Sequence, residues 1–331
     1  ATTTVNGPFN LSGLPGINGN RTLNNAGTAN WTATSGLGLW TGTGSVINNT
    51  GTWDSKTDNV AIVNQYGGAT TFNNFGTFKK SAGTGTTTIS IPFVNTGTVD
   101  VQSGTLNVSS SNYTQNGGTT KLTGGALTST TSLNIQGGSL AGSGTVTGPV
   151  IVSGTGALAP GLSAGTLGLA GNYTQQGPSG AFNVELGGTT PGTQFDRADV
   201  TGAGGATLAG NLNVSFINPF TPSPGDSFTI MTYPSHTGTF TLNAPAITCR
   251  AWDVNYGATS VVLTSFSLPT ELRGLTMLPD KTGLQWNAAP AYAGTTYDLL
   301  RGELNTLPVG PGAGESCLGQ GISGTTTTDT D

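Results

Sequence analysis

The chain has 331 residues, of which 54 are Gly and only 8% are charged, and its formal net charge is −5. Globular domains carry roughly 25% charged residues, so the chain lacks the Glu, Lys and Arg of ion-paired helices, and the composition disfavours an α-rich fold. A disordered chain combines low hydrophobicity with high net charge, whereas here apolar residues recur at short intervals. The scattered Lys and Arg residues do not form the basic patch that nucleic-acid binding requires.

No apolar stretch is long enough for a membrane-spanning helix, because Gly, Thr and Asn interrupt every candidate. The sequence begins at Ala1 with Thr-rich polar residues, which fits an exported protein after removal of its signal peptide. We therefore expect no direct insertion into a membrane.

A short phrase recurs four times, as NNAGT at 24–28, NNTGT at 48–52, NNFGT at 73–77 and VNTGT at 94–98. Its glycines are 24, 25 and 21 residues apart, a spacing typical of solenoid coils. Each phrase predicts a strand end, an Asn corner that adopts a left-handed conformation or bonds its own backbone, a Gly that allows positive φ, and a Thr that opens the next strand. Coils stacked about 4.8 Å apart would place Asn above Asn. The predicted corner residues are Asn25, Gly27, Asn49, Gly51, Asn74, Gly76, Asn95 and Gly97.

The sequence predicts four segments. Residues 1–22 form an N-terminal strand or cap, and residues 23–176 form solenoid coils with Gly-rich corners. Residues 177–266, where charges return and strands lengthen, form the final coils and a cap, because an open last coil presents an unpaired edge. Residues 267–331 form a small antiparallel β-sandwich-like module, with strands expected at 272–278, 283–286 and 296–301.

Candidate catalytic residues are few. GLSAG at 161–165 matches the G-x-S-x-G pattern of a nucleophilic serine, but no helix pattern follows it and His236 is the single His. We therefore interpret the pattern as a Gly-rich corner. No Cys, His or Asp spacing matches a metal or nucleotide motif, so neither catalytic residues nor a cofactor nor a metal is expected.

Two carboxylate pairs are close in the sequence, Asp54 with Asp58 and Asp196 with Asp199. Polysaccharide-degrading β-helix enzymes use two or three acids on one face, so such an enzyme is a lower alternative. We interpret Asp54 and Asp58 as members of a solvated polar loop near the N-terminal end of the solenoid.

The two cysteines allow two arrangements. Cys249 and Cys317 either pair with each other and hold the terminal module to the solenoid, which contributes about 2–4 kcal/mol, or Cys317 pairs with a partner outside the chain.

Three tryptophans also have two interpretations, as aromatic contacts to a glycan or as core residues of the first coils: Trp31, Trp40 and Trp53.

Residues 140–265 resemble the C-terminal part of bacterial autotransporter-type passenger β-helices. The resemblance rests on GALAPGLSAGTL at 156–167, GNYTQ at 171–175, ELGG at 185–188, FD at 195–196 and GNLNV at 210–214. It implies a right-handed parallel β-helix, exported to the cell surface and usually without catalysis in the helix itself. The chain departs from a true autotransporter because no membrane barrel follows residue 266.

Residues 268–301 resemble the first strands of a fibronectin type III-like module. Trp286 stands in the position of its strand B tryptophan and Tyr297 in that of its strand C tyrosine. Such modules need about 100 residues, more than remain here, so we expect either that the chain is a fragment or that something outside the chain completes the module.

The sequence therefore predicts a non-enzymatic structural protein, secreted to the bacterial cell surface or matrix. Its sharper form is a subunit that assembles head-to-tail into an extracellular filament, in which the N-terminal strand of one copy completes the module of the next. The main alternative is an adhesin that binds glycans or host surfaces through loops. The expected partners are copies of the chain itself, with glycans or cell-surface components as the other possibility and no nucleic acid.

Overall fold

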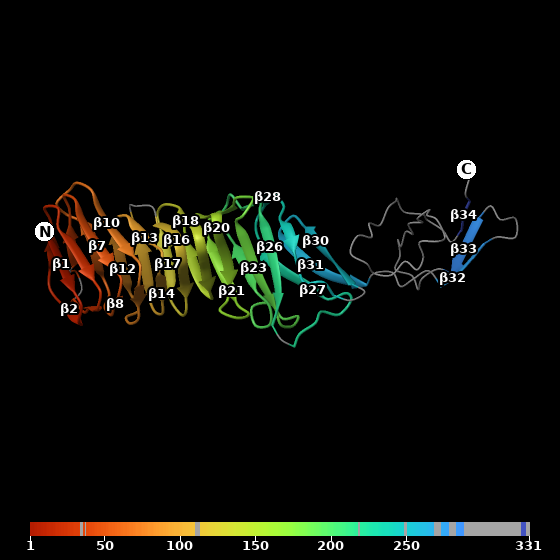
Figure 1. Ribbon diagram of the computed structural model, residues 1–331, viewed down its shortest axis with the longest axis horizontal. Coiled ribbons are helices and arrows are strands. Elements are labelled where there is room, and N and C mark those ends of the chain that lie inside the picture. The colour runs from red at the N-terminus through yellow and green to blue at the C-terminus, as the bar shows by residue number, and fades with distance from the viewer. Residues whose placement is uncertain are drawn as a thin grey trace. The chain divides into compact units, whose positions relative to one another are not determined.

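The computed structural model describes residues 1–33, 36, 38–109, 113–217, 219–247 and 250–267, with three further strands at 273–277, 283–287 and 326–328. The regular elements among these residues are β-strands, and no helix among them is long and apolar enough to cross a membrane. The chain divides into two compact units, residues 1–247 with 251–266 and residues 248–250 with 267–331. The first unit is a parallel β-solenoid, as the repeat predicts (Figure 1).

Each coil of the solenoid contributes strands to three rows, of which the first two form one 19-stranded sheet. The first row contains β1 (Thr2–Val5), β4 (Thr22–Asn25), β7 (Ser45–Asn49), β10 (Thr70–Asn74), β13 (Phe93–Asn95), β22 (Tyr173–Gln175), β25 (Ala206–Leu208) and β28 (His236–Gly238). The second row contains β2 (Phe9–Leu11), β5 (Thr28–Trp31), β8 (Thr52–Ser55), β11 (Thr77–Lys80), β14 (Thr98–Val101), β23 (Ala181–Leu186), β26 (Asn211–Phe216) and β29 (Thr241–Asn243). Three long strands span both rows: β16 (Tyr113–Leu122), β18 (Leu133–Gly142) and β20 (Val150–Pro160).

The third row forms a 12-stranded sheet. Its parallel strands are β3 (Gly16–Ile17), β6 (Gly38–Thr41), β9 (Val60–Asn64), β12 (Thr86–Ser90), β15 (Thr105–Val108), β17 (Ala126–Ser129), β19 (Gly144–Thr147), β21 (Thr166–Ala170), β24 (Arg197–Val200) and β27 (Ser227–Thr232). Two further strands, β31 (Ser260–Ser267) and β30 (Arg250–Tyr256), follow β27 at the edge, and β31 pairs antiparallel with β27.

The repeated phrase forms the corner between the first and second rows, as predicted, but its glycines serve a different purpose. None of the four has positive φ. Instead, a Cβ on Gly51 would lie 2.1 Å from the carbonyl oxygen of Gly27, and one on Gly76 would lie 2.2 Å from that of Gly51. The glycines are needed because successive corners stack backbone on backbone, which leaves no room for a side chain.

The corner asparagines form a buried ladder through the interior. Each side-chain amide donates to Oδ1 of the asparagine one coil further on, at 2.7 Å from Asn25 to Asn49 and from Asn49 to Asn74, and 2.8 Å from Asn74 to Asn95. The same amides also donate to the carbonyls of Thr52, Thr77 and Thr98. The stacking of Asn above Asn is confirmed. The prediction that each Asn bonds its own corner holds only for the long bonds from Asn74 to Gly76 and from Asn95 to Gly97.

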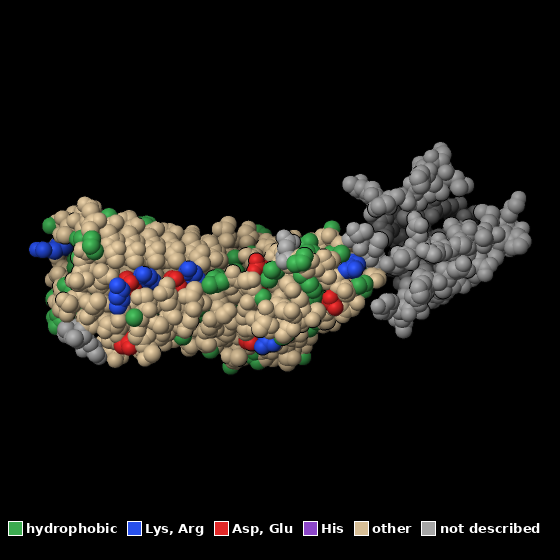
Figure 2. Space-filling view, turned by 90° about the horizontal axis from the view of Figure 1, so that it is seen from below, with side chains coloured by type: hydrophobic (Ala, Val, Ile, Leu, Met, Phe, Trp, Pro, Cys, Tyr) green, Lys and Arg blue, Asp and Glu red, His purple; other side chains and the backbone are tan. Residues whose placement is uncertain are grey.

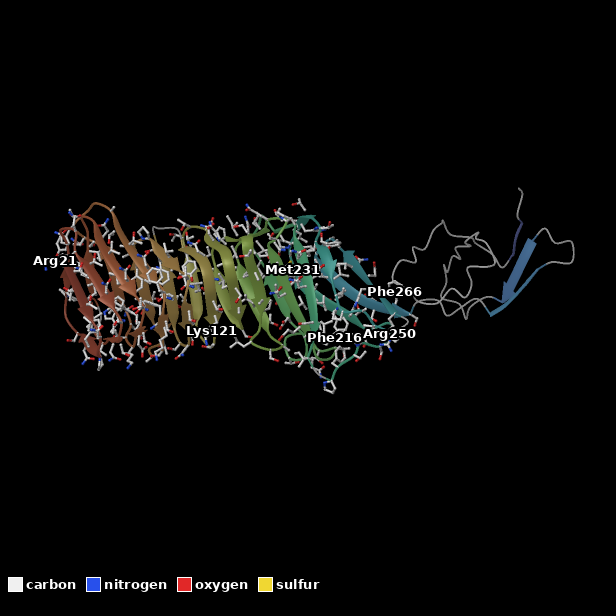
Figure 3. All side chains as sticks on the ribbon, viewed as in Figure 1. Arg21, Lys121, Phe216, Met231, Arg250 and Phe266 are labelled. Carbon is white, nitrogen blue, oxygen red and sulfur yellow. The ribbon has the colours of Figure 1, made fainter. Side chains whose placement is uncertain are left out.

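Aromatic rings stack beside this ladder. The rings of Phe72 and Phe93 are 5.1 Å apart and those of Phe93 and Tyr113 are 5.6 Å apart, both stacked, while Trp53 meets Phe72 edge-on at 5.2 Å. All four side chains are fully buried. Inward side chains of this kind fill the interior along the solenoid (Figure 3), so apolar burial and stacked polar ladders both favour one register between coils.

The C-terminal end of the solenoid is closed by the β30–β31 hairpin. Trp252 of β30 lies with its ring 6.2 Å from Phe216 and 6.3 Å from Phe228, and its indole donates to the carbonyl of Pro245 at 3.1 Å. Tyr256 accepts a hydrogen bond from the backbone N–H of Phe240 at 2.9 Å. These contacts cover apolar side chains of the last coils.

The second unit contains a small antiparallel sheet of β32 (Arg273–Met277), β33 (Gly283–Asn287) and β34 (Thr326–Thr328). The strands expected at 272–278 and 283–286 are present. The strand expected at 296–301, and Tyr297 within it, lie outside the described residues.

Candidate functional site: an outer column of side chains

One line of outward-facing side chains runs along the second row from the first coil to the last. The strand register places one member on each coil, with Ala159 next to Asn183 because Leu158 pairs with Phe182. We call this line the outer column: Asn10, Asn30, Asp54, Lys79, Asp100, Lys121, Ala141, Ala159, Asn183, Asn213 and Asn243.

The N-terminal part of the outer column alternates in charge. Lys79 Nζ lies 3.2 Å from Asp54 Oδ2, and Lys121 Nζ lies 3.3 Å from Asp100 Oδ2. Lys56 also reaches Asp54, at 3.5 Å, and Ser81 and Thr123 donate to the two aspartates. Figure 2 shows these charges as a row along the solenoid. Opposite charges on adjacent coils favour this register, whereas like charges would oppose it.

The C-terminal part of the outer column is a second asparagine ladder. Asn243 donates to Oδ1 of Asn213 at 3.0 Å, and Asn213 donates to Oδ1 of Asn183 at 2.9 Å. Between the charges and the amides stand two alanines, Ala141 and Ala159. A groove of about 440 Å³ lies at this point, and both alanines line it.

The groove is bounded by the turn that follows β20. Asp196, only 2% exposed, holds this turn against β23: its Oδ1 accepts from the backbone N–H of Gly165 and its Oδ2 from that of Glu185, both at 2.9 Å. Burial raises the pKa of the Asp196 carboxyl to about 7, although the two N–H donors oppose the shift. The GLSAG pattern is thus a turn fixed by Asp196, while His236 lies in β28 with its ring 4.9 Å from that of Tyr233.

The carboxylates of the two pairs found in the sequence have separate partners in the structure. Asp54 was expected in a solvated loop, but it lies in β8, 3% exposed, because Lys56 and Lys79 cover it. Asp58 instead pairs with Lys80 at 3.0 Å. Asp199 pairs with Arg197 at 2.8 Å and accepts from Thr232.

Lys80 is the one fully buried lysine among the described residues. Its ammonium donates to Asp58 Oδ1 at 3.0 Å and to the carbonyls of Ala82 and Thr57 at 2.9 and 3.3 Å. The hydrogen bond from Lys80 holds the pKa of the Asp58 carboxyl below its usual range, with help from backbone N–H groups of Gly85 and Thr84.

Two of the three tryptophans predicted to contact a glycan are inaccessible. Trp31 and Trp53 are 1% and 0% exposed because they face into the solenoid, where their rings meet edge-on at 6.2 Å. For these two residues the glycan interpretation is wrong, and the alternative interpretation, as core residues of the first coils, is confirmed. Trp40 is half-buried, with its ring 6.2 Å from that of the exposed Tyr66.

The two cysteines of the predicted disulfide, Cys249 and Cys317, both lie outside the described residues. Within the described part of the chain, no three His, Cys, Asp or Glu side chains gather as a metal site. The sequence did not predict a binding site at the groove: Gly161, Leu162 and Asp196 belonged to candidate catalytic patterns, and Ala141, Ala159 and Asn183 to none. The signal that would have found them is the break at Ala141 and Ala159 in a column that otherwise carries polar or charged residues, and it becomes visible only once the coils are in register.

No protein-family model matches this sequence, and no curated protein matches it. The expected autotransporter-type and fibronectin type III-like identities therefore rest on the sequence resemblance, and the established result is the all-β parallel solenoid.

Proposed function

We propose that this chain is a non-enzymatic structural protein, a stiff solenoid that is exported to a bacterial cell surface or matrix. The observation that supports this most directly is the continuity of the ladders through the interior and along the outer column. Each coil is held to the next by hydrogen bonds, ring stacking or ion pairs. Such contacts repeat along one axis and favour a stiff rod.

The sharper proposal is head-to-tail assembly of copies of this chain through the first coil. In the described part of the chain, β1, β2 and β3 each pair with one strand only. Thr22 N–H donates to the carbonyl of Ala1, and Ala26 N–H donates to that of Val5. In a parallel ladder the alternate residues Thr2 and Thr4 then direct their backbone groups away from β4, toward any strand added to this edge.

This assembly differs from donation of a free N-terminal strand. Thr2–Val5 is paired within its own solenoid as β1, so the strand expected to complete another copy's module is already used. Addition of another copy to the open edge of the first coil does not require β1 to leave its own solenoid.

Electron microscopy of the chain, with intact-mass analysis of the same sample, tests the proposal. Filaments of repeating rods are expected, and Thr4→Pro should shorten or abolish them, because proline removes an N–H on the open edge while leaving the backbone bonds to β4 intact. Thr4→Val keeps that N–H and serves as the control. Single rods at all concentrations, or filaments that Thr4→Pro leaves unchanged, would overturn head-to-tail assembly.

A further inference from the structure

We propose that the groove at Ala141 and Ala159 binds a neutral sugar chain that lies along the solenoid axis. This site is independent of filament formation. If the protein is an adhesin, this groove would be its glycan-binding site in place of the tryptophans. The groove lies on a regular face of the solenoid, whereas the sequence predicted binding through loops.

The hollow arises from the side chains of two successive coils. On these two coils the outer column carries only the methyl group of an alanine. On all the remaining coils it carries Asp, Lys or Asn. Lys121 before the gap is turned to Asp100 by its ion pair. The lining extends from β16 to β26, which is four coil steps or roughly 19 Å at about 4.8 Å each. An extended chain molecule fits this shape better than a compact ligand.

The amide of Asn183 supplies donors within the groove. In the second asparagine ladder each Nδ2 donates toward the preceding coil, from Asn243 to Asn213 and from Asn213 to Asn183. The preceding coil places Ala159 beside Asn183, and a methyl group cannot accept. Asn183 lines the groove, and no hydrogen bond from its Nδ2 occurs within the described residues, so these donors are available to a ligand there.

Other groups along the groove match the alternating surface of a sugar. The hydroxyls of Ser139 and Ser215 and the carboxylate of Glu185 line it and can bond sugar hydroxyls. Leu162 also lines it and is 64% exposed, which offers an apolar surface to the C–H face of a ring. A few polar groups on a largely apolar surface are typical of ligand sites.

Charge decides between neutral and acidic sugars. The carboxylate of Glu185 lines the groove, and no Lys or Arg does, so an anionic polysaccharide would meet repulsion. A cation is also disfavoured, because both oxygens of Asp196 already accept backbone N–H groups and Glu185 is then the one carboxylate left.

Isothermal titration with cellohexaose, mannohexaose and chitohexaose, and with polygalacturonate as the acidic comparison, tests the proposal on the full chain. Ala159→Lys should weaken binding of the preferred neutral sugar at least about tenfold, because it fills the groove with a residue that this column already carries at Lys79 and Lys121. Asn183→Ala should weaken it about tenfold through loss of the donors. Asn243→Ala removes an amide from the far end of the same ladder, outside the groove, and should bind as the unmodified chain does.

Circular dichroism establishes that each variant keeps its strands, and Asn183→Ala provides the test if Ala159→Lys does not fold. The proposal is overturned if none of the three neutral oligosaccharides binds. It is equally overturned if polygalacturonate binds more tightly, or if Ala159→Lys and Asn183→Ala bind no more weakly than Asn243→Ala.

Discussion

The side-chain amide of Asn49 donates to Oδ1 of Asn74 at 2.7 Å and to the carbonyl of Thr77 at 2.9 Å, in a fully buried position. Its neighbour Asn48 makes a similar bond to Asn24 at 2.9 Å on the outer side of the strand. Two adjacent asparagines with the same kind of partner thus differ in their access to water.

This difference predicts unequal effects of the same substitution. Asn49→Ala removes the acceptor of one Asn25 amide hydrogen and the donor to Asn74 Oδ1 and the Thr77 carbonyl, and it should lower the free energy of unfolding by about 3–5 kcal/mol. Asn48→Ala exposes its partners to water and should cost about 1 kcal/mol or less. Urea denaturation followed by circular dichroism measures both, and equal losses would contradict a structural role for the buried ladder.

The stacked corners predict that an added methyl group is not tolerated at Gly51. Its Cβ would lie 2.1 Å from the carbonyl oxygen of Gly27, so the two coils must separate, at a cost of about 1–3 kcal/mol or more. Gly13→Ala is the matched control, because a Cβ there meets nothing within 4 Å. Thermal unfolding should show a lower midpoint for Gly51→Ala alone, and identical midpoints would exclude the close approach as the reason for this glycine.

The Lys80–Asp58 pair predicts an asymmetry between its two partners. Asp58→Ala leaves a fully buried ammonium with carbonyl partners only and should cost about 3–5 kcal/mol. Lys80→Met leaves a carboxylate whose side chain is 28% exposed and still accepts from Thr84, so the cost should be about 1–2 kcal/mol. Denaturation of both variants at neutral pH checks the order, and the reverse order would contradict it.

The same pair predicts a loss of stability in acid. Because the Lys80 hydrogen bond lowers the pKa of Asp58 from 3.8, its contribution is complete above that value and is lost as pH falls toward the lower folded-state pKa. Stability measured from about pH 5 to about pH 2 should fall less steeply in Lys80→Met than in the unmodified chain. An unchanged slope would show that the pair does not shift this carboxyl.

Asp196 predicts the opposite pH dependence of stability, a loss as pH rises. Burial raises its pKa from 3.8 to about 7, so between about pH 4 and about pH 7 the unfolded chain ionises this carboxyl while the folded protein keeps its proton. Its contribution to the free energy of unfolding should therefore decline across that window as pH rises and level off above it. Asp196→Asn should remove this decline, whereas Asp199→Asn should retain it; a decline that persists in Asp196→Asn would assign it to another group.

Several features of the fold were predictable from particular residues. The phrase NNAGT and its three relatives predicted stacked corners, because Asn, Gly and Thr recur at coil-length spacing and each has a local role in a turn. The structure corrected the role of Gly51 and Gly76, which are required by the approach of a neighbouring coil and not by φ. That approach involves residues about 25 positions away, so no local pattern reports it.

The sequence by itself determined the all-β solenoid, since low charge, dense glycine and a repeated corner admit few other ways to satisfy the backbone. The tertiary structure decided which side chains face water. It buried Trp53 and Lys80, aligned Asp54, Lys79, Asp100 and Lys121 into one row, and set two alanines between that row and the amides. Coil lengths vary, so the register that brings these residues together follows from the stacking of whole coils and not from a fixed count along the chain.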